Sequence, residues 1–211
     1  MRPDIEEVLR YLGAGQTASE ELRRQVLEIG VKLELRIRPR WTWKAIALDG
    51  NCPIPIEGDL ARTMLAQCDS AVVLCCTLGM EFDALLRSEQ ARDLSRAVIV
   101  DAWGSAWVEQ GCDEAEKEIA SRFPERFLTD RFSPGYGDLP LSMQREICTL
   151  LDLERRLGVY RGESDLLTPW KTVTAIIGLS DRPQMARIRG CESCAMRETC
   201  ALRKGGTRCG I

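Results

Sequence analysis

The 211-residue sequence contains no histidine, and this absence argues against several classes of function. Without imidazole there is no Ser-His or Cys-His catalytic pair, no histidine general base and no mixed Cys/His zinc site. Hydrolytic catalysis by those routes is therefore not expected.

A strong charge excess and a long apolar run are also lacking. Lys and Arg number 29 against 32 Asp and Glu, a balance that is not typical of a nucleic-acid-binding protein. No apolar run approaches the ~20 residues that span a bilayer, and residues 1–13 are too charged for a secretory signal. We therefore expect a cytoplasmic protein with no nucleic-acid or membrane partner.

The spacing of apolar residues predicts an α+β fold. A long amphipathic helix is predicted over residues 94–123, and the run over 70–77 has the length and β-branched content of a strand buried on both faces. Further helices are predicted over 4–11, 20–33, 59–68, 80–86 and 142–157, and further strands over 35–48, 165–168 and 173–179. Because the elements lack a regular βαβ rhythm, we expect a twisted, largely antiparallel sheet flanked by helices.

The chain divides by pattern into three parts. These are an N-terminal helical arm over 1–34, a core over 35–185 and a cysteine-rich tail over 186–211. The arm is expected to cover a hydrophobic surface of the core. Joining two subunits as a homodimer is the alternative.

Four of the ten cysteines lie close together in the tail. Cys191, Cys194, Cys200 and Cys209 have the spacing C-x2-C-x5-C-x8-C, in which the C-x2-C pair places two thiolates on one tight turn. The pattern predicts a metal site and fits structural zinc or an iron–sulfur cluster equally well by residue type. A disulfide pair or an empty tail is the alternative.

Residues 131–140 combine an arginine with strong turn signals. The segment reads Arg131-Phe132-Ser133-Pro134-Gly135-Tyr136-Gly137-Asp138-Leu139-Pro140. Its backbone must turn tightly, and we expect peptide groups that face a ligand. Arg131 can pair with both oxygens of a carboxylate, and Tyr136 offers an aromatic face, which together suit a small zwitterion. On the residues alone, an ordered turn with Arg131 in a salt bridge and Tyr136 packed is the favoured alternative.

The spacing R-x-x-x-G-Y-x-x-x-P in this segment resembles the loop by which the activation domain of cobalamin-dependent methionine synthase binds S-adenosylmethionine. The likeness covers about residues 35–180. Its other parts are Leu157-Gly158-Val159, Glu163-Ser164, the stretch from Pro169 to Gly178, and the run from Cys68 through Gly79. Where the family usually has Pro-Ala-Cys, this chain has Gly137-Asp138-Leu139.

The resemblance implies a set of ligand-binding residues. S-adenosylmethionine would bind around Arg131, Pro134, Gly135, Tyr136 and Gly137, with Asp101 or Glu109 as a partner of its amine or ribose. Arg131 would hold the carboxylate, the turn's backbone the amino group and adenine, and Tyr136 would pack beside the methyl or the corrin edge.

The resemblance also implies a reactivation role in a methionine synthase-like methyltransferase. The methyl acceptor would be cob(I)alamin on a corrinoid protein, or on methionine synthase modules supplied in trans. Two alternatives stay open. One is an iron–sulfur protein that passes electrons from a donor to a corrinoid protein, and the other is a non-catalytic subunit of a split methionine synthase.

Overall fold

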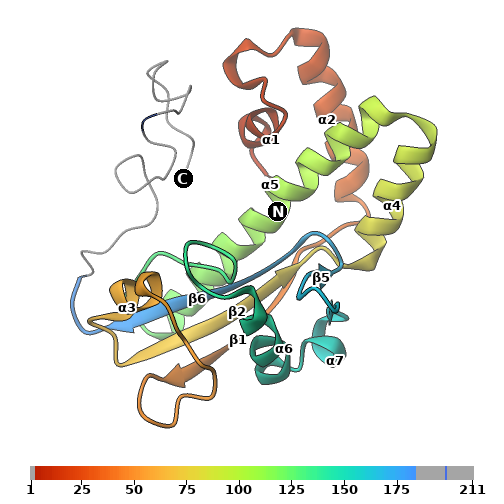
Figure 1. Cartoon of the computed structure of the whole chain (residues 1–211). Coiled ribbons are helices and arrows are strands. Elements are labelled where there is room, and N and C mark those ends of the chain that lie inside the picture. Colours follow the sequence, from red (N-terminus) through yellow and green to blue (C-terminus); the bar gives the residue numbers. More distant parts are fainter. Residues whose placement is uncertain (1–2, 184–197, 199–211) are drawn as a thin grey trace.

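A computed structural model describes residues 3–183 and residue 198, and it confirms the predicted α+β fold. Its main sheet has four antiparallel strands in the order β1-β2-β6-β3 (Figure 1). Their bounds are Arg40–Ala47 for β1, Ser70–Thr77 for β2, Phe127–Leu128 for β3 and Thr172–Ser180 for β6. A separate ribbon pairs β4 (Tyr160–Arg161) with β5 (Leu167–Thr168).

The sheet separates two hydrophobic cores, and β2 contributes to both. Successive strand residues point to opposite faces, so Val72, Leu74 and Cys76 belong to one core and Ala71, Val73 and Cys75 to the other. All six are fully buried. This confirms the prediction of a strand covered on both faces, and of Cys75 and Cys76 as packed thiols.

Helices of different length cover the two faces (Figure 1). One core contains residues of α1 (Ile5–Tyr11), α2 (Glu20–Glu34), α4 (Gly79–Arg92) and α5 (Leu94–Arg122). The other contains residues of α3 (Asp59–Leu65), α6 (Gln144–Leu151) and α7 (Leu153–Leu157). The longest helix, α5, begins where Asp93 accepts hydrogen bonds from the backbone N–H groups of Ser95 and Arg96, an N-cap. No helix of the described residues is long and apolar enough to cross a membrane.

The N-terminal helices pack against α5 and cover its apolar surface. Val8 and Leu9 of α1 and Val26 of α2 are fully buried. The indole N–H of Trp103 donates to the carbonyl of Val26 at 2.9 Å. A Cβ on Gly30 would lie 2.3 Å from that indole ring, so only glycine allows α2 to approach so closely. This packing supports the expectation that the arm covers the core. The three-part division of the chain stays a prediction.

Two predicted elements have different bounds in the structure. The strand expected over 35–48 begins only at Arg40 because the chain first turns after α2, where the backbone N–H groups of Arg36 and Ile37 donate to the Leu33 carbonyl. The helix expected over 142–157 is divided into the short helix η2 (Leu141–Met143), α6 and α7. Asp152 interrupts it with a left-handed φ of 50°. The interruption lets both Leu151 and Leu153 be buried, which residues two apart on a continuous helix cannot do on one face.

Candidate functional site

The segment after β3 is held against the sheet by Phe132. Its backbone exchanges two hydrogen bonds with Ile176 of β6. The N–H of Phe132 donates to the Ile176 carbonyl at 3.1 Å, and the N–H of Ile176 donates to the Phe132 carbonyl at 2.8 Å. The Phe132 side chain is buried in the core shared with α6 and α7. This anchoring fixes the position of the neighbouring Arg131 on the opposite side, where α5 lies.

The turn that follows has the predicted shape but different hydrogen bonding. Gly135 and Gly137 have φ angles of +87° and +59°, which glycine adopts readily. The N–H of Gly135 donates to the Leu139 carbonyl and that of Tyr136 to the Ser133 carbonyl, at 2.9 and 3.1 Å. The expectation that these two peptide N–H groups are free for a ligand is therefore wrong, because the turn uses them to close itself.

Asp138 ties the turn to α3. Its carboxylate accepts hydrogen bonds from the backbone N–H groups of Asp59 and Leu60, the latter at 3.0 Å. These backbone donors lower the pKa of Asp138 below its usual value. Gly137 also contacts α3, since a Cβ there would lie 3.1 Å from Leu60 Cδ2. The Gly137-Asp138-Leu139 departure from the family pattern thus has a structural role in this chain.

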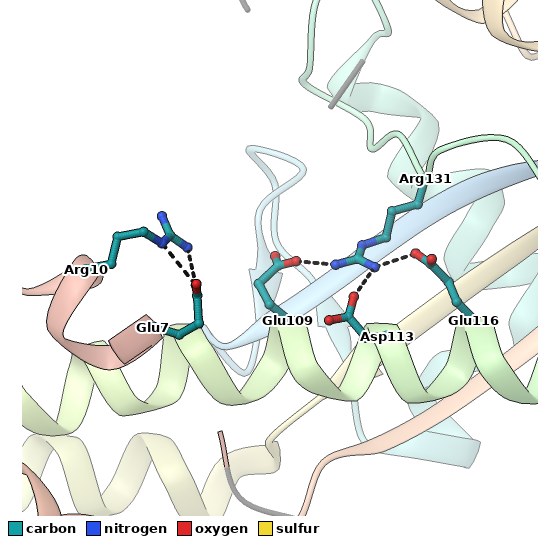
Figure 2. A network of polar contacts seen from close by, with 6 residues as sticks. All are labelled: Glu7, Arg10, Glu109, Asp113, Glu116 and Arg131. Carbon is teal, nitrogen blue, oxygen red and sulfur yellow. Dashed lines mark hydrogen bonds and ion pairs between the residues drawn. The ribbon is translucent and has the colours of Figure 1, made fainter. Parts of the chain in front are cut away.

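Arg131 lies against three carboxylates of α5 (Figure 2). Its Nη2 donates to Glu109 at 2.6 Å, and its Nη1 donates to Asp113 at 2.7 Å and also to Glu116. The arginine side chain is only 9% exposed. Burial opposes its charge, but the nearby carboxylates, Glu116 foremost, outweigh that effect and raise the pKa of Arg131 above its usual value. The salt-bridged alternative is thus what the structure shows for Arg131, whereas Tyr136 is 47% exposed and not packed.

Asp101 or Glu109 was expected as a partner of the ligand's amine or ribose, and α5 places the two residues differently. Asp101, Ser105, Glu109 and Asp113 follow one another at i+4 spacing and so share one helix face. Glu109 joins Arg131, but Asp101 pairs with Lys171, 2.9 Å from Nζ. Ser105 accepts a hydrogen bond from the same Nζ at 2.8 Å. The structure therefore brings Glu109, and not Asp101, to Arg131.

A cleft of about 650 Å³ opens between the Arg131 segment, α5 and α1. The residues that line it are Pro3, Asp4, Glu7, Arg10, Tyr11, Ala106, Glu109, Gln110, Asp113, Arg131, Phe132, Ser133, Tyr136 and Val173. Of the predicted ligand-binding residues, Arg131, Tyr136 and Glu109 line this cleft. Among the described residues, Pro134, Gly135 and Gly137 shape the turn without lining the cleft, and Asp101 lines an adjacent hollow of about 260 Å³ that shares Tyr11.

The wall formed by α1 was not predicted. Glu7 and Arg10 pair at 2.7 Å on the side of α1 that faces the cleft (Figure 2). Arg10 also stacks over the ring of Tyr11, 4.5 Å from its centroid. The polar side of the predicted helix over 4–11 was the signal available in the sequence. That signal does not say which surface the polar side faces.

Comparison with known proteins gives a structural likeness. No protein-family model matches the sequence, and no curated protein matches it significantly. Among solved structures, the chain is similar to a crystal structure of the MetH reactivation domain bound to AdoHcy. The TM-score is 0.61 at 15% sequence identity, over 98% of this chain and 85% of that one. The two proteins share a fold.

The structure does not test the predicted metal site. Cys191, Cys194, Cys200 and Cys209 lie outside the described residues, so zinc or an iron–sulfur cluster there stays a prediction. Within the described residues, no group of three or more Cys, Asp or Glu side chains is arranged to hold a metal ion. The cysteines in that part of the chain are unpaired thiols, and burial raises the pKa of Cys75 well above its usual value.

Proposed function

We propose that the chain binds S-adenosylmethionine in the cleft beside Arg131 and acts as a reactivation subunit for a corrinoid-dependent methyltransferase. One observation carries the proposal. The segment with the R-x-x-x-G-Y spacing forms a wall of the 650 Å³ cleft, in a chain that shares the fold of the MetH reactivation domain bound to AdoHcy. That volume suits a ligand of this size.

The guanidinium of Arg131 keeps part of its donor set for a ligand. It has five N–H donors, and the three carboxylates of α5 take both at Nη1 and one at Nη2. These three ion pairs do not use the N–H at Nε or the second N–H at Nη2. This side-on pair matches the two oxygens of the ligand's carboxylate. The acidic residues of α5 meanwhile hold the guanidinium in one orientation.

The exposed ring of Tyr136 would pack on the ligand beside its sulfonium. Cob(I)alamin on the partner would supply a nucleophilic electron pair for the methyl carbon, and the electrons of the broken carbon–sulfur bond would stay on sulfur. The residues of this chain would bind the methyl donor, orient it and exclude water from it. Four further points stay predictions: the corrinoid partner, a homodimer, an electron donor and the cytoplasmic location.

Titration calorimetry with S-adenosylmethionine tests the proposal. Tyr136→Ala is the informative variant because the side chain is 47% exposed and should be dispensable for folding. Loss of its ring contact should weaken binding about tenfold, ~1.4 kcal/mol. Tyr160→Ala is the matched control, since Tyr160 is 50% exposed but lies on β4 and not on the cleft. Absence of heat at millimolar ligand, or equal weakening by both variants, would contradict the proposal.

A further inference from the structure

A second hollow, of about 390 Å³, lies where α2, α4 and the start of α5 meet (Figure 1). Its lining residues are Ile29, Lys32, Leu33, Arg36, Glu81, Ala84, Leu85, Ser88, Glu89, Arg92, Arg96 and Val100. Among the described residues, none lines both this hollow and the 650 Å³ cleft, so the two are separate sites. The volume of the hollow is within the range of small-ligand sites.

The hollow carries a surplus of positive charge. Four cations and two carboxylates line it, so the formal balance is two positive charges. The two acids are both paired, since Arg36 Nη2 lies 3.3 Å from Glu81 and Arg96 Nε lies 3.2 Å from Glu89. An anion that enters the hollow therefore meets cations without displacing a carboxylate.

The two remaining cations, Lys32 and Arg92, have no acidic partner among residues 3–183. Each is in the last turn of its helix, α2 and α4 respectively, where the helix dipole favours a positive charge. Arg96 differs, because it is in the first turn of α5, where the dipole disfavours a cation. Its pair with Glu89 uses Nε and not the two Nη groups. Three cations from three helices thus border one hollow, and helix stability does not explain the third.

The floor of the hollow is apolar. Ile29 and Leu33 of α2 and Val100 of α5 are at most 3% exposed, and Leu85 of α4 packs against the same core. A bare inorganic anion would leave these carbon atoms in contact with water, whereas a ligand with an apolar part would cover them. The lining therefore favours an organic anion.

The charge and the arrangement of the cations favour a phosphate group over a carboxylate. A phosphate monoester carries between 1.5 and 2 negative charges near neutral pH, about equal to the surplus of the hollow. Its three terminal oxygens accept hydrogen bonds from several directions, so cations on three helices can contact it together. A carboxylate has one charge, and one planar guanidinium matches both of its oxygens.

We propose that the hollow between α2, α4 and α5 binds a small organic phosphate. Lys32, Arg92 and Arg96 hold the phosphate group, and the apolar floor contacts the body of the ligand. Because α2 belongs to the N-terminal arm, the bound phosphate joins the arm to the core. A ligand that binds only the folded chain in this way also raises its thermal stability.

Calorimetry on the full chain with phenyl phosphate tests the proposal. At ~20 mM salt it should bind with a dissociation constant below about 1 mM, about tenfold more tightly than inorganic phosphate, which lacks the apolar part. Benzoate, which has a ring but one charge, should bind about fivefold more weakly than phenyl phosphate. Absence of heat at ~10 mM phenyl phosphate, or equal binding of benzoate, would overturn the proposal.

Two variants locate the site. Lys32→Gln and Arg92→Gln change exposed residues, and each should weaken the binding of phenyl phosphate about fivefold. Arg87→Gln is the matched control, because Arg87 is exposed on α4 and does not line the hollow. Equal weakening by the control would mean a general effect of net charge and would overturn the site. Binding of S-adenosylmethionine should be unchanged in all three variants, so this proposal and the proposed function can fail separately.

Sedimentation with vesicles that contain phosphatidic acid distinguishes a free organic phosphate from a lipid headgroup. The chain should stay in the supernatant, because the hollow is expected to take a whole small molecule. Co-sedimentation that Lys32→Gln abolishes would overturn the assignment to a free ligand.

Discussion

Two cations lie against the same face of α5, and they are neutralised in different ways. Lys171 meets one carboxylate, Asp101, and the hydroxyl of Ser105. Arg131 meets three carboxylates, those of Glu109, Asp113 and Glu116. The first arrangement is balanced, as expected of a pair that only joins α5 to the residue before β6. The second has three carboxylates for one cation and borders the 650 Å³ cleft, the end of the helix at which we propose ligand binding.

Removing the Arg131 cation should have the largest effect on stability. Arg131→Met leaves three carboxylates facing one another at a site where the arginine was 9% exposed. Breaking a buried ion pair from one side costs about 3–5 kcal/mol, and the partial exposure of the acids reduces the expected loss here to about 2–3 kcal/mol. Urea denaturation measures this change.

A second substitution shows whether that loss comes from repulsion between the acids. Glu116 is the least exposed of the three, at 24%, so Glu116→Gln in the Arg131→Met background should restore part of the lost stability. A loss below about 0.5 kcal/mol in Arg131→Met, within the range of ordinary surface changes, would show that the cluster does not stabilise the fold.

Removing the Lys171 cation should have a smaller effect. Asp101 is 50% exposed, so water can solvate its carboxylate after Lys171→Met, and methionine keeps most of the apolar stem that packs near Gly104. The expected loss is about 0.5–1 kcal/mol in the same urea experiment. If Lys171→Met were as destabilising as Arg131→Met, the contrast between the two ends of α5 would be wrong.

Features that depend on local sequence were predictable. The run from Ser70 to Thr77 is apolar on both faces, and it is the strand that both cores share. The length of α5 followed from its apolar period. The start of β1 and the break at Asp152 were not predictable in this way, because each depends on which side chains the rest of the fold buries.

The candidate site shows the same limit. The tight turn around Gly135 and Gly137 is encoded by the residues themselves, and its two positive φ angles confirm it. The acids that bind Arg131 lie 15–22 residues earlier in the chain. Glu109 and Asp113 are visible in the sequence as an i+4 acidic row, but nothing local says that an arginine faces them. The wall of the cleft that α1 supplies is still more distant in the sequence, and it was not predicted.

The smallest effect is expected where the Arg131 turn is held to α3. Asp138 is exposed and contacts backbone N–H groups rather than a cation. Asp138→Asn should lower the urea midpoint slightly, and the change should depend on pH. Because these N–H groups lower the pKa of Asp138 in the folded state, its carboxylate stabilises the protein fully above its unfolded pKa of about 3.9.

That contribution is lost as the pH falls through the lower, folded-state pKa, since a protonated carboxyl accepts the two hydrogen bonds poorly. The urea midpoints of wild type and Asp138→Asn should therefore differ at neutral pH and converge below about pH 4. Asp181→Asn, an exposed acid just after β6, serves as the control and should show no such convergence. A difference that persists at low pH would mean that Asp138 acts through packing. The turn would then owe its position to Gly137 and Phe132, and the orientation of Arg131 would depend on the sheet and α5 alone.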